Sequence, residues 1–130
     1  MLKRFLTVGI LLMLGLSSAQ QLEFVTTSLA PTFNDFFEPL VARANKQFGT
    51  SVKWTDLPQN AIQQKVLAGI AAGNPPDAVQ LNSTQILELA QQGALLPLND
   101  LLDAATLKNY QKTALDAFTY EGKIYGLPDY

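Results

Sequence analysis

Short polar side chains follow three stretches of the chain that are rich in strand-forming residues. They lie at Ser28 to Thr32, at Asp56 to Asn60 and at Asn82 to Thr84. Hydroxyl and amide groups both pair well with a neutral sugar or another polyol, whose many donors and acceptors need partners when they leave water. We therefore predict a polyol-binding site, with Ser28, Asn82 and Ser83 as ligand contacts.

The composition excludes several other kinds of chemistry. The 130 residues contain no histidine and no cysteine, which rules out a Ser-His-Asp or Cys-His nucleophile, a zinc site of these residues and a disulfide. A glycosidase with two carboxylates is a less favoured alternative, because the 11 acidic residues show no catalytic spacing and no Gly-x-Ser-x-Gly motif occurs. The nine basic residues form no cluster for nucleic acid beyond the N-terminus. We predict a binding protein that is not an enzyme and needs no cofactor or metal.

The N-terminal segment has the layout of a secretory signal. Lys3 and Arg4 precede an apolar run at 5–16, and the small residues at 17–19 fit a signal-peptidase site. A membrane anchor would need about 20 apolar residues, whereas this run has 12. We predict cleavage after residue 19, which leaves 20–130 as the mature chain. Since the chain has no cysteine to carry a lipid, we expect this chain to be free in the periplasm.

The mature part alternates between strand patterns and helix patterns. Strands are predicted at 22–27 and 51–56 from their β-branched and aromatic residues, and a short buried strand at 78–81. Between and after them, apolar residues spaced by three and four predict three helices. The helical faces consist of Phe33, Phe37, Leu40, Val41, Ala44 and Phe48, then Ile62, Val66, Leu67 and Ile70, then Ile86, Leu87, Leu89 and Ala90.

Polar residues at the predicted helix starts can cap them. Thr32 with Asp35 supplies a capping box for the first helix, and Asn60 can cap the second. A proline inside a helix costs about 3 kcal/mol, so the first helix either begins near Asp35 or kinks at Pro39. A glycine is expected to end each helix, at Gly49, Gly73 and Gly93.

This alternation predicts an α/β fold. Parallel neighbouring strands need crossover connections, so we expect a parallel sheet with helices on both faces. The pattern changes after Gly93. We expect an extended segment at 95–98, one or two short helices within 101–115, and a turn between short strands at 120–124.

Three local patterns resemble those of the extracellular solute-binding proteins of family 1, which serve sugar ABC transporters. They are LAGIAAGNPPDAV at 67–79, QGALLPL at 92–98 and YEGKIYGLP at 120–128. The resemblance implies an α/β, periplasmic-binding-protein-like (type II) fold, with a parallel-type sheet flanked by helices. It also implies that 20–130 is the N-terminal lobe of a two-lobe protein, truncated at the hinge and incomplete without the second lobe.

The resemblance implies the recognition subunit of an ABC importer. Such a subunit, a monomer, captures a sugar or oligosaccharide in the periplasm and delivers it to the membrane permease by hinge closure. It also brings Asp129 and Tyr130, which follow the Gly-Leu-Pro pattern, near the cleft, where a carboxylate beside an aromatic ring is a common sugar-binding pair. Two alternatives remain open, a polyol phosphate such as a glycerol phosphate ester as the ligand, or a truncated lobe without function.

Several candidate residues also have structural explanations. Asn82 with Gln85 can cap the third helix, Ser83 can do the same, and Ser28 can be a plain turn residue.

The same choice applies within and just after the predicted strands. Trp54 can stack on a sugar ring or belong to the core, and Asp56 can touch a ligand or be a solvated carboxylate at a strand end. Asp77 is assigned a structural role in the turn beside the prolines.

Overall fold

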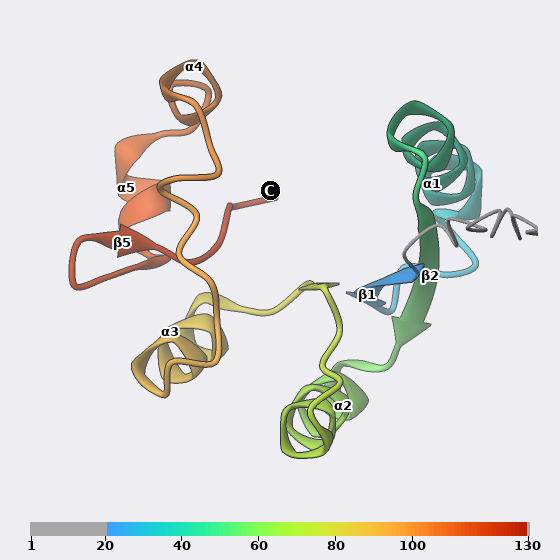
Figure 1. The fold of residues 1–130 in the computed structure, drawn as a ribbon, viewed down its shortest axis with the longest axis horizontal. Helices are drawn as coiled ribbons and strands as arrows, with labels where there is room; N and C mark the ends of the chain where they lie inside the picture. The colour runs from blue at the N-terminus through green and yellow to red at the C-terminus, as the bar shows by residue number, and fades with distance from the viewer. Residues whose placement is uncertain (1–20, 130) are drawn as a thin grey trace, which may run out of the picture.

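The structure, a computed structural model, describes residues 21–129 (Figure 1). The predicted signal segment and Tyr130 lie outside the described residues. None of the described helices has the length and apolarity needed to cross a membrane. The elements are β1 (Gln21–Thr27), α1 (Asn34–Phe48), β2 (Ser51–Leu57), α2 (Gln59–Ala72), β3 (Ala78–Val79), α3 (Ser83–Gln91), α4 (Ala104–Leu107), α5 (Lys112–Asp116), β4 (Thr119–Tyr120) and β5 (Lys123–Ile124).

The first three strands form the predicted parallel sheet, in the order β2–β1–β3. β1 and β2 pair along their whole length, from Gln21↔Ser51 to Thr27↔Leu57. β3 is shorter than the predicted strand at 78–81, and the prediction that it is buried is wrong, since Ala78 is exposed. Within residues 21–129, β3 lies at the edge of the sheet and pairs only with β1, so no described strand pairs with its other side.

Helices cover both faces of the sheet, as predicted. Neighbouring side chains of a strand point to opposite faces, and the fully buried Val25 packs on the face of α2 and α3. Its partners in this core are Ile62, Val66 and Leu89. On the opposite face, the Phe37 ring of α1 stacks on Trp54 with ring centroids 5.0 Å apart. Each fully buried aliphatic side chain contributes about 1.5–3 kcal/mol, so the α2 face holds much of the stabilising burial.

The start of α1 agrees with one of the two predictions for Pro39. The helix begins at Asn34, so Pro39 lies in its second turn. The predicted capping box of Thr32 and Asp35 is wrong, because Phe33 occupies the N-cap position and no side chain caps the helix. Thr32 instead belongs to a turn that is closed by a 2.9 Å hydrogen bond from the Phe33 amide to the Leu29 carbonyl.

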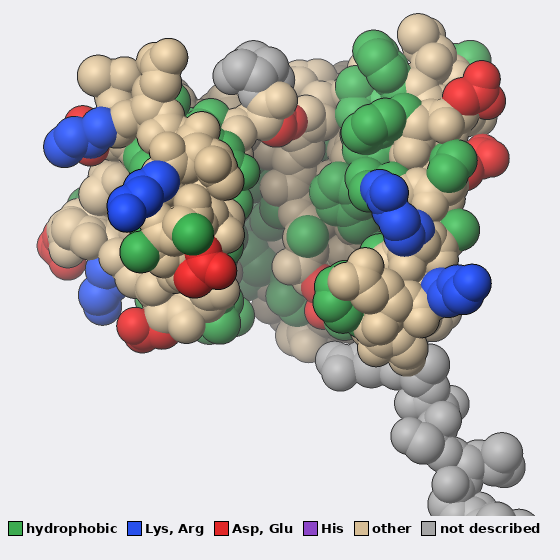
Figure 2. Space-filling view, turned by 90° about the horizontal axis from the view of Figure 1, so that it is seen from above, with side chains coloured by type: hydrophobic (Ala, Val, Ile, Leu, Met, Phe, Trp, Pro, Cys, Tyr) green, Lys and Arg blue, Asp and Glu red, His purple; other side chains and the backbone are tan. Residues whose placement is uncertain are grey.

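The predicted apolar face of α1 is only partly covered. Phe37 is half-buried, but Phe33 is 48% exposed and Phe48 is 69% exposed. Phe36, which the predicted face left out, is 61% exposed and packs edge-on against Phe37. Figure 2 shows hydrophobic side chains gathered on the α1 side, across a hollow from the side that carries α4 and α5.

The second and third helices confirm most of the predicted ends. α2 begins at Gln59 with Pro58 at the N-cap position, so the predicted cap at Asn60 is wrong. Proline suits a helix start because its fixed φ and its missing amide hydrogen cost nothing there. Gly73, at φ 71°, ends α2 as predicted. Asn82 forms the predicted capping box of α3, since its Oδ1 accepts from the Gln85 amide at 2.9 Å.

The C-terminal part also follows the sequence pattern. Of the two short helices, α4 lies within 101–115 and α5 ends at Asp116, just beyond it. β4 and β5 form an antiparallel hairpin. Residues 95–98 form no strand. Their connection to the hairpin is a 2.7 Å hydrogen bond from the Leu98 amide to the Ile124 carbonyl.

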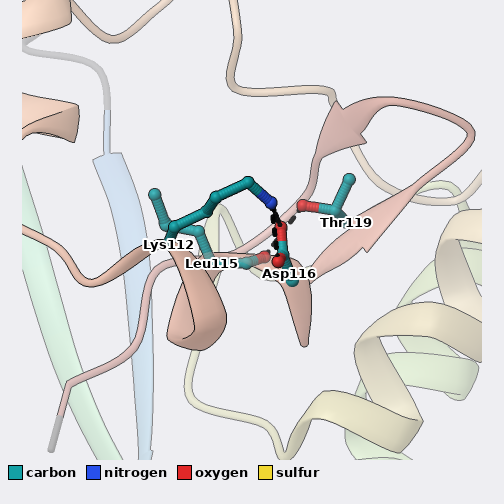
Figure 3. A network of polar contacts seen from close by, with 4 residues as sticks. All are labelled: Lys112, Leu115, Asp116 and Thr119. Atoms are coloured by element: carbon teal, nitrogen blue, oxygen red, sulfur yellow. Dashed lines mark hydrogen bonds and ion pairs between the residues drawn. The ribbon is translucent and has the colours of Figure 1, made fainter.

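A small network holds the end of α5 (Figure 3). The Thr119 hydroxyl donates to the Leu115 carbonyl at 2.8 Å, and the same carbonyl also accepts from the Phe118 amide at 2.9 Å. Lys112 pairs with Asp116 at 2.8 Å. This exposed pair contributes little to stability, because water screens such charges.

Candidate functional site

The loops predicted to bind a ligand meet at one end of the sheet. β1 leads into Ser28, β2 leads through Pro58 into α2, and β3 leads through Gln80 into α3. Because the three strands are parallel, their carboxyl ends form one edge, which we call the carboxyl edge. In open parallel sheets, ligands bind outside this edge, where loops and helix N-termini converge.

A continuous row of hydrogen bonds crosses the carboxyl edge. The Thr27 hydroxyl donates to Gln59 Oε1 at 3.1 Å, and the Thr27 amide donates to Gln80 Oε1 at 3.1 Å. Gln80 Nε2 then donates to Asp129 Oδ2 at 2.6 Å. These four residues, which we call the edge row, connect α2, β1, the residue after β3 and the C-terminal segment. Their amide, hydroxyl and carboxylate groups are suited to the hydroxyls of a neutral polyol.

The structure brings two of the predicted contacts to this edge. Asp129 is exposed and belongs to the edge row. Ser28 is exposed and directly follows β1 and Thr27, with a left-handed φ of 54°. Its amide donates to the Leu57 carbonyl at 3.0 Å, which ties the end of β1 to the end of β2.

The other described candidates, Asn82 and Ser83, are not members of the edge row. Asn82 is exposed, but its side-chain oxygen caps α3, as its structural explanation requires. Ser83 is the half-buried first residue of that helix. Tyr130 lies outside the described residues. Ligand contact by Ser28, Asn82, Ser83, Asp129 and Tyr130 therefore stays a prediction.

The sequence interpretation missed three members of the edge row. Thr27 and Gln80 were assigned to or beside predicted strands without a role in binding, and Gln59 lies in the predicted ligand loop at 56–60 but was not singled out as a contact. One signal was available for Gln80, because it is a polar residue between Val79 and Leu81 in a segment predicted to be buried. A polar side chain in such a place needs a hydrogen-bond partner.

Asp56 is not a solvated carboxylate, because both of its oxygens accept hydrogen bonds from the protein. It is half-buried, and Oδ1 accepts from the Thr26 hydroxyl at 2.7 Å. The Leu29 amide lies 3.0 and 3.1 Å from the two carboxylate oxygens, and the Ala30 amide donates to Oδ2 at 3.0 Å. Burial raises the pKa of Asp56, but the hydrogen bonds from Leu29, Thr26 and Ala30 outweigh it and hold this pKa below its ordinary value.

Trp54 is half-buried and its side chain packs within the protein, which favours the structural explanation over stacking on a sugar ring. Its ring is stacked on Phe37, and its Nε1 donates to Thr26 Oγ1 at 2.8 Å. The structural role predicted for Asp77 is confirmed. Asp77 Oδ2 accepts from the Glu23 amide at 2.7 Å, near the start of β1 and away from the carboxyl edge.

The ion pair of Lys65 and the two described cavities include no residue of the edge row. Lys65 pairs with Glu23 at 3.0 Å, and this contact holds the pKa of Glu23 below its ordinary value. A cavity of about 330 Å³ lies beside this pair, and one of about 110 Å³ lies between α2 and α3. Neither cavity is lined by the edge row. Residues 21–129 contain no cluster of acidic side chains that could hold a metal ion.

Comparison with protein families gives a match over most of the chain. The family described as bacterial extracellular solute-binding protein matches residues 39–129. No curated protein sequence matches the chain.

The chain is also similar to solved structures of proteins that hold bound saccharides. A maltotriose-binding protein from Thermus thermophilus, bound with maltotriose, is 28% identical, with a TM-score of 0.72 over 81% of this chain and 28% of that one. CpMnBP1 with mannotriose bound is 32% identical, with a TM-score of 0.72 over 84% and 28%. An ABC substrate-binding protein from Listeria monocytogenes in complex with cycloalternan is 26% identical, with a TM-score of 0.69 over 84% and 28%. These likenesses confirm the predicted type II fold class, and the chain spans about 28% of the length of these structures.

Proposed function

The chain belongs to the bacterial extracellular solute-binding proteins, and on this premise we propose that it captures a sugar or oligosaccharide for an ABC importer. The matched family and the similar structures are binding proteins rather than enzymes. The similar structures hold maltotriose, mannotriose and cycloalternan, which are all neutral saccharides. We propose the same class of ligand for this chain.

The edge row is the observation that supports this function best. Thr27, Gln59, Gln80 and Asp129 present hydroxyl, amide and carboxylate groups on one edge of the sheet. A saccharide hydroxyl both donates and accepts, so it can pair with either end of an amide. Side chains that are already held by one another lose little further freedom when a ligand binds.

The charge of the edge row favours a neutral ligand over a polyol phosphate. Its ionisable member is the carboxylate of Asp129, which would repel a phosphate. Of the described lysines, Lys65 is paired with Glu23, and Lys53 lines the cavity beside that pair. Neither of these two lysines would therefore neutralise the charge of a phosphate ester bound at the carboxyl edge.

We further propose how the lobe works. The described residues form one lobe, and Ser28, Asn82, Ser83, Asp129 and Tyr130 contact the ligand together with Gln59 and Gln80. A second lobe closes over the ligand about a hinge, and the closed form is the one that the membrane permease recognises. Cleavage of the signal after residue 19 delivers the protein to the periplasm.

Calorimetric titration of the whole protein tests the ligand class. We expect saturable binding of maltotriose or mannotriose and no heat with glycerol 3-phosphate. Binding of the phosphate ester alone, or of none of the three, would overturn the proposal. Asp129→Asn is expected to weaken saccharide binding, whereas the control Asp116→Asn, in the exposed pair of α5, is expected to leave it unchanged.

A separate measurement tests export. Mass spectrometry of the protein recovered from the periplasm of an expressing bacterium should give Gln20 as the first residue. An intact N-terminus on membrane-bound protein would contradict the predicted cleavage.

A further inference from the structure

Asp56 joins the end of β2 to the loop that leaves β1. Asp56 pairs with Thr26 in the parallel register of β2 and β1, so its side chain lies beside the last residues of β1. One carboxylate accepts from the Thr26 hydroxyl at 2.7 Å and from the consecutive amides of Leu29 and Ala30 at 3.0–3.1 Å. Both oxygens are thus taken by the protein, and Asp56 has little capacity left for a ligand.

The Thr26 hydroxyl, which donates to this carboxylate, is itself held in place by Trp54. Thr26 is 1% exposed, and its hydroxyl accepts from the Trp54 indole at 2.8 Å while it donates to Asp56. The Trp54 ring is fixed against Phe37 of α1. Hydrogen bonds to an ionised acceptor are stronger than those between neutral groups, so this arrangement gives a rigid anchor.

The anchored loop begins with Ser28. This residue has a φ of 54°, a backbone conformation that residues other than glycine adopt only when their surroundings impose it. The contacts that impose it lie on both sides. The Ser28 amide is bound to the Leu57 carbonyl at 3.0 Å, and the next two amides are bound to Asp56.

We propose that Asp56 is a positioning residue of the ligand site, which acts by holding Ser28 at the carboxyl edge next to Thr27 of the edge row. This inference rests on the proposed function, because it assumes that the carboxyl edge binds the saccharide. It also explains why a carboxylate stands at the end of β2 although both of its oxygens are bound by the protein.

A double-mutant cycle on saccharide affinity tests this role. Asp56→Asn keeps the shape of the side chain but replaces one acceptor oxygen with a donor, so it loses at least one of the loop contacts. We expect Asp56→Asn and Ser28→Ala each to raise Kd about tenfold, and the double variant to raise it no further, because both act through the same loop. Additive effects, about a hundredfold in the double variant, would overturn the proposal.

A matched control separates positioning from general loss of stability. Asp77 also accepts a hydrogen bond from a backbone amide, that of Glu23, but at the opposite end of β1. Asp77→Asn is expected to lower the unfolding temperature while Kd stays within twofold of the wild-type value. A tenfold rise in Kd for Asp77→Asn would mean that any damage to the sheet weakens binding, and the proposal would fall.

Hydrogen exchange in the absence of ligand makes the anchor testable even if no saccharide binds. The Leu29 and Ala30 amides are expected to exchange at least tenfold faster in Asp56→Asn than in the wild type, and unchanged in Asp77→Asn. Unchanged exchange in Asp56→Asn would overturn the anchor itself, whereas fast exchange without any saccharide binding would overturn only the proposed function. If Asp56→Asn does not fold, Thr26→Val, which removes one bond to the carboxylate, is measured in its place with the same expected direction.

Discussion

The side-chain amide of Gln80 donates a 2.6 Å hydrogen bond to Asp129, 49 residues further along the chain. The same side chain accepts from the Thr27 amide through its oxygen. One amide therefore sets the spacing between the end of β1, the end of β3 and the C-terminal segment. Because the two ends of the amide have different roles, this position distinguishes glutamine from its isosteres.

Gln80→Glu should weaken saccharide binding at pH 7 by about 10- to 100-fold, the range expected when a hydrogen bond to a charged group is lost. The new carboxylate cannot donate to Asp129, and the two like charges repel each other. Calorimetry measures the effect. The control is Gln85→Glu, because glutamate also completes a capping box, so its Kd should not change. Equal affinity of Gln80→Glu and the wild type would show that the edge row is not the ligand site.

Two substitutions at Asn82 separate its role as a helix cap from a role in binding. Asn82→Ala should lower the free energy of unfolding by about 1 kcal/mol, because it removes the capping box of α3. Asn82→Asp should keep the stability, since aspartate caps a helix as well as asparagine. Urea unfolding measures both. If Asn82→Asp keeps the stability but loses saccharide affinity, Asn82 contacts the ligand, and if it keeps both, that predicted contact is wrong.

Gly69 lies where α2 packs closely against the turn that follows it. A Cβ on Gly69 would lie 2.9 Å from Pro75 Cα and 3.0 Å from the Asn74 carbonyl oxygen. In an exposed helix, alanine is about 1 kcal/mol more favourable than glycine, but here the backbone must move. We expect Gly69→Ala to be destabilising by about 1–3 kcal/mol. Thermal unfolding measures this effect, and the exposed neighbouring substitution Ala68→Ser is the control. Higher stability of Gly69→Ala would contradict the close packing.

The sequence pattern predicted the order of the elements well, because this order depends on local features. β-branched residues at 22–27 and 51–56, and glycines such as Gly73, act over a few neighbouring positions. The wrong helix caps, at Thr32 and Asn60, have a different origin. A side chain caps a helix only from the N-cap position, and in the structure Phe33 and Pro58 occupy that position in α1 and α2.

The site was less predictable because its contacts join residues far apart in the sequence. Ser28 could be proposed from its polar side chain after a predicted strand and Asp129 from the resemblance, and both lie at the carboxyl edge. No local pattern links Thr27 to Gln80, or Asp56 to Leu29. These pairs exist because the strand order β2–β1–β3 places their elements side by side.

The anchor formed by Asp56 should make stability depend on acid pH. Its pKa lies below the ordinary value in the folded protein, so folding favours the ionised carboxylate. The resulting stabilisation is complete above the unfolded value of about 3.9 and is lost as the pH falls through the lower folded value. Glu23 has a lowered pKa for a different reason, the contact with Lys65, and acts in the same direction.

Urea unfolding of the wild type and of Asp56→Asn between pH 7 and pH 3 tests this dependence. At pH 7 we expect the variant to be less stable by about 1.5–3 kcal/mol, as for hydrogen bonds to a charged group. The difference should begin to shrink below about pH 3.9, the unfolded value, because the wild type starts to lose the stabilisation by its ionised anchor there while the variant has none to lose. Asp100→Asn, at an exposed position, is the control and should leave the stability at pH 7 unchanged. A difference between Asp56→Asn and the wild type that stays constant with pH would mean that the carboxylate acts by its shape and not by its charge.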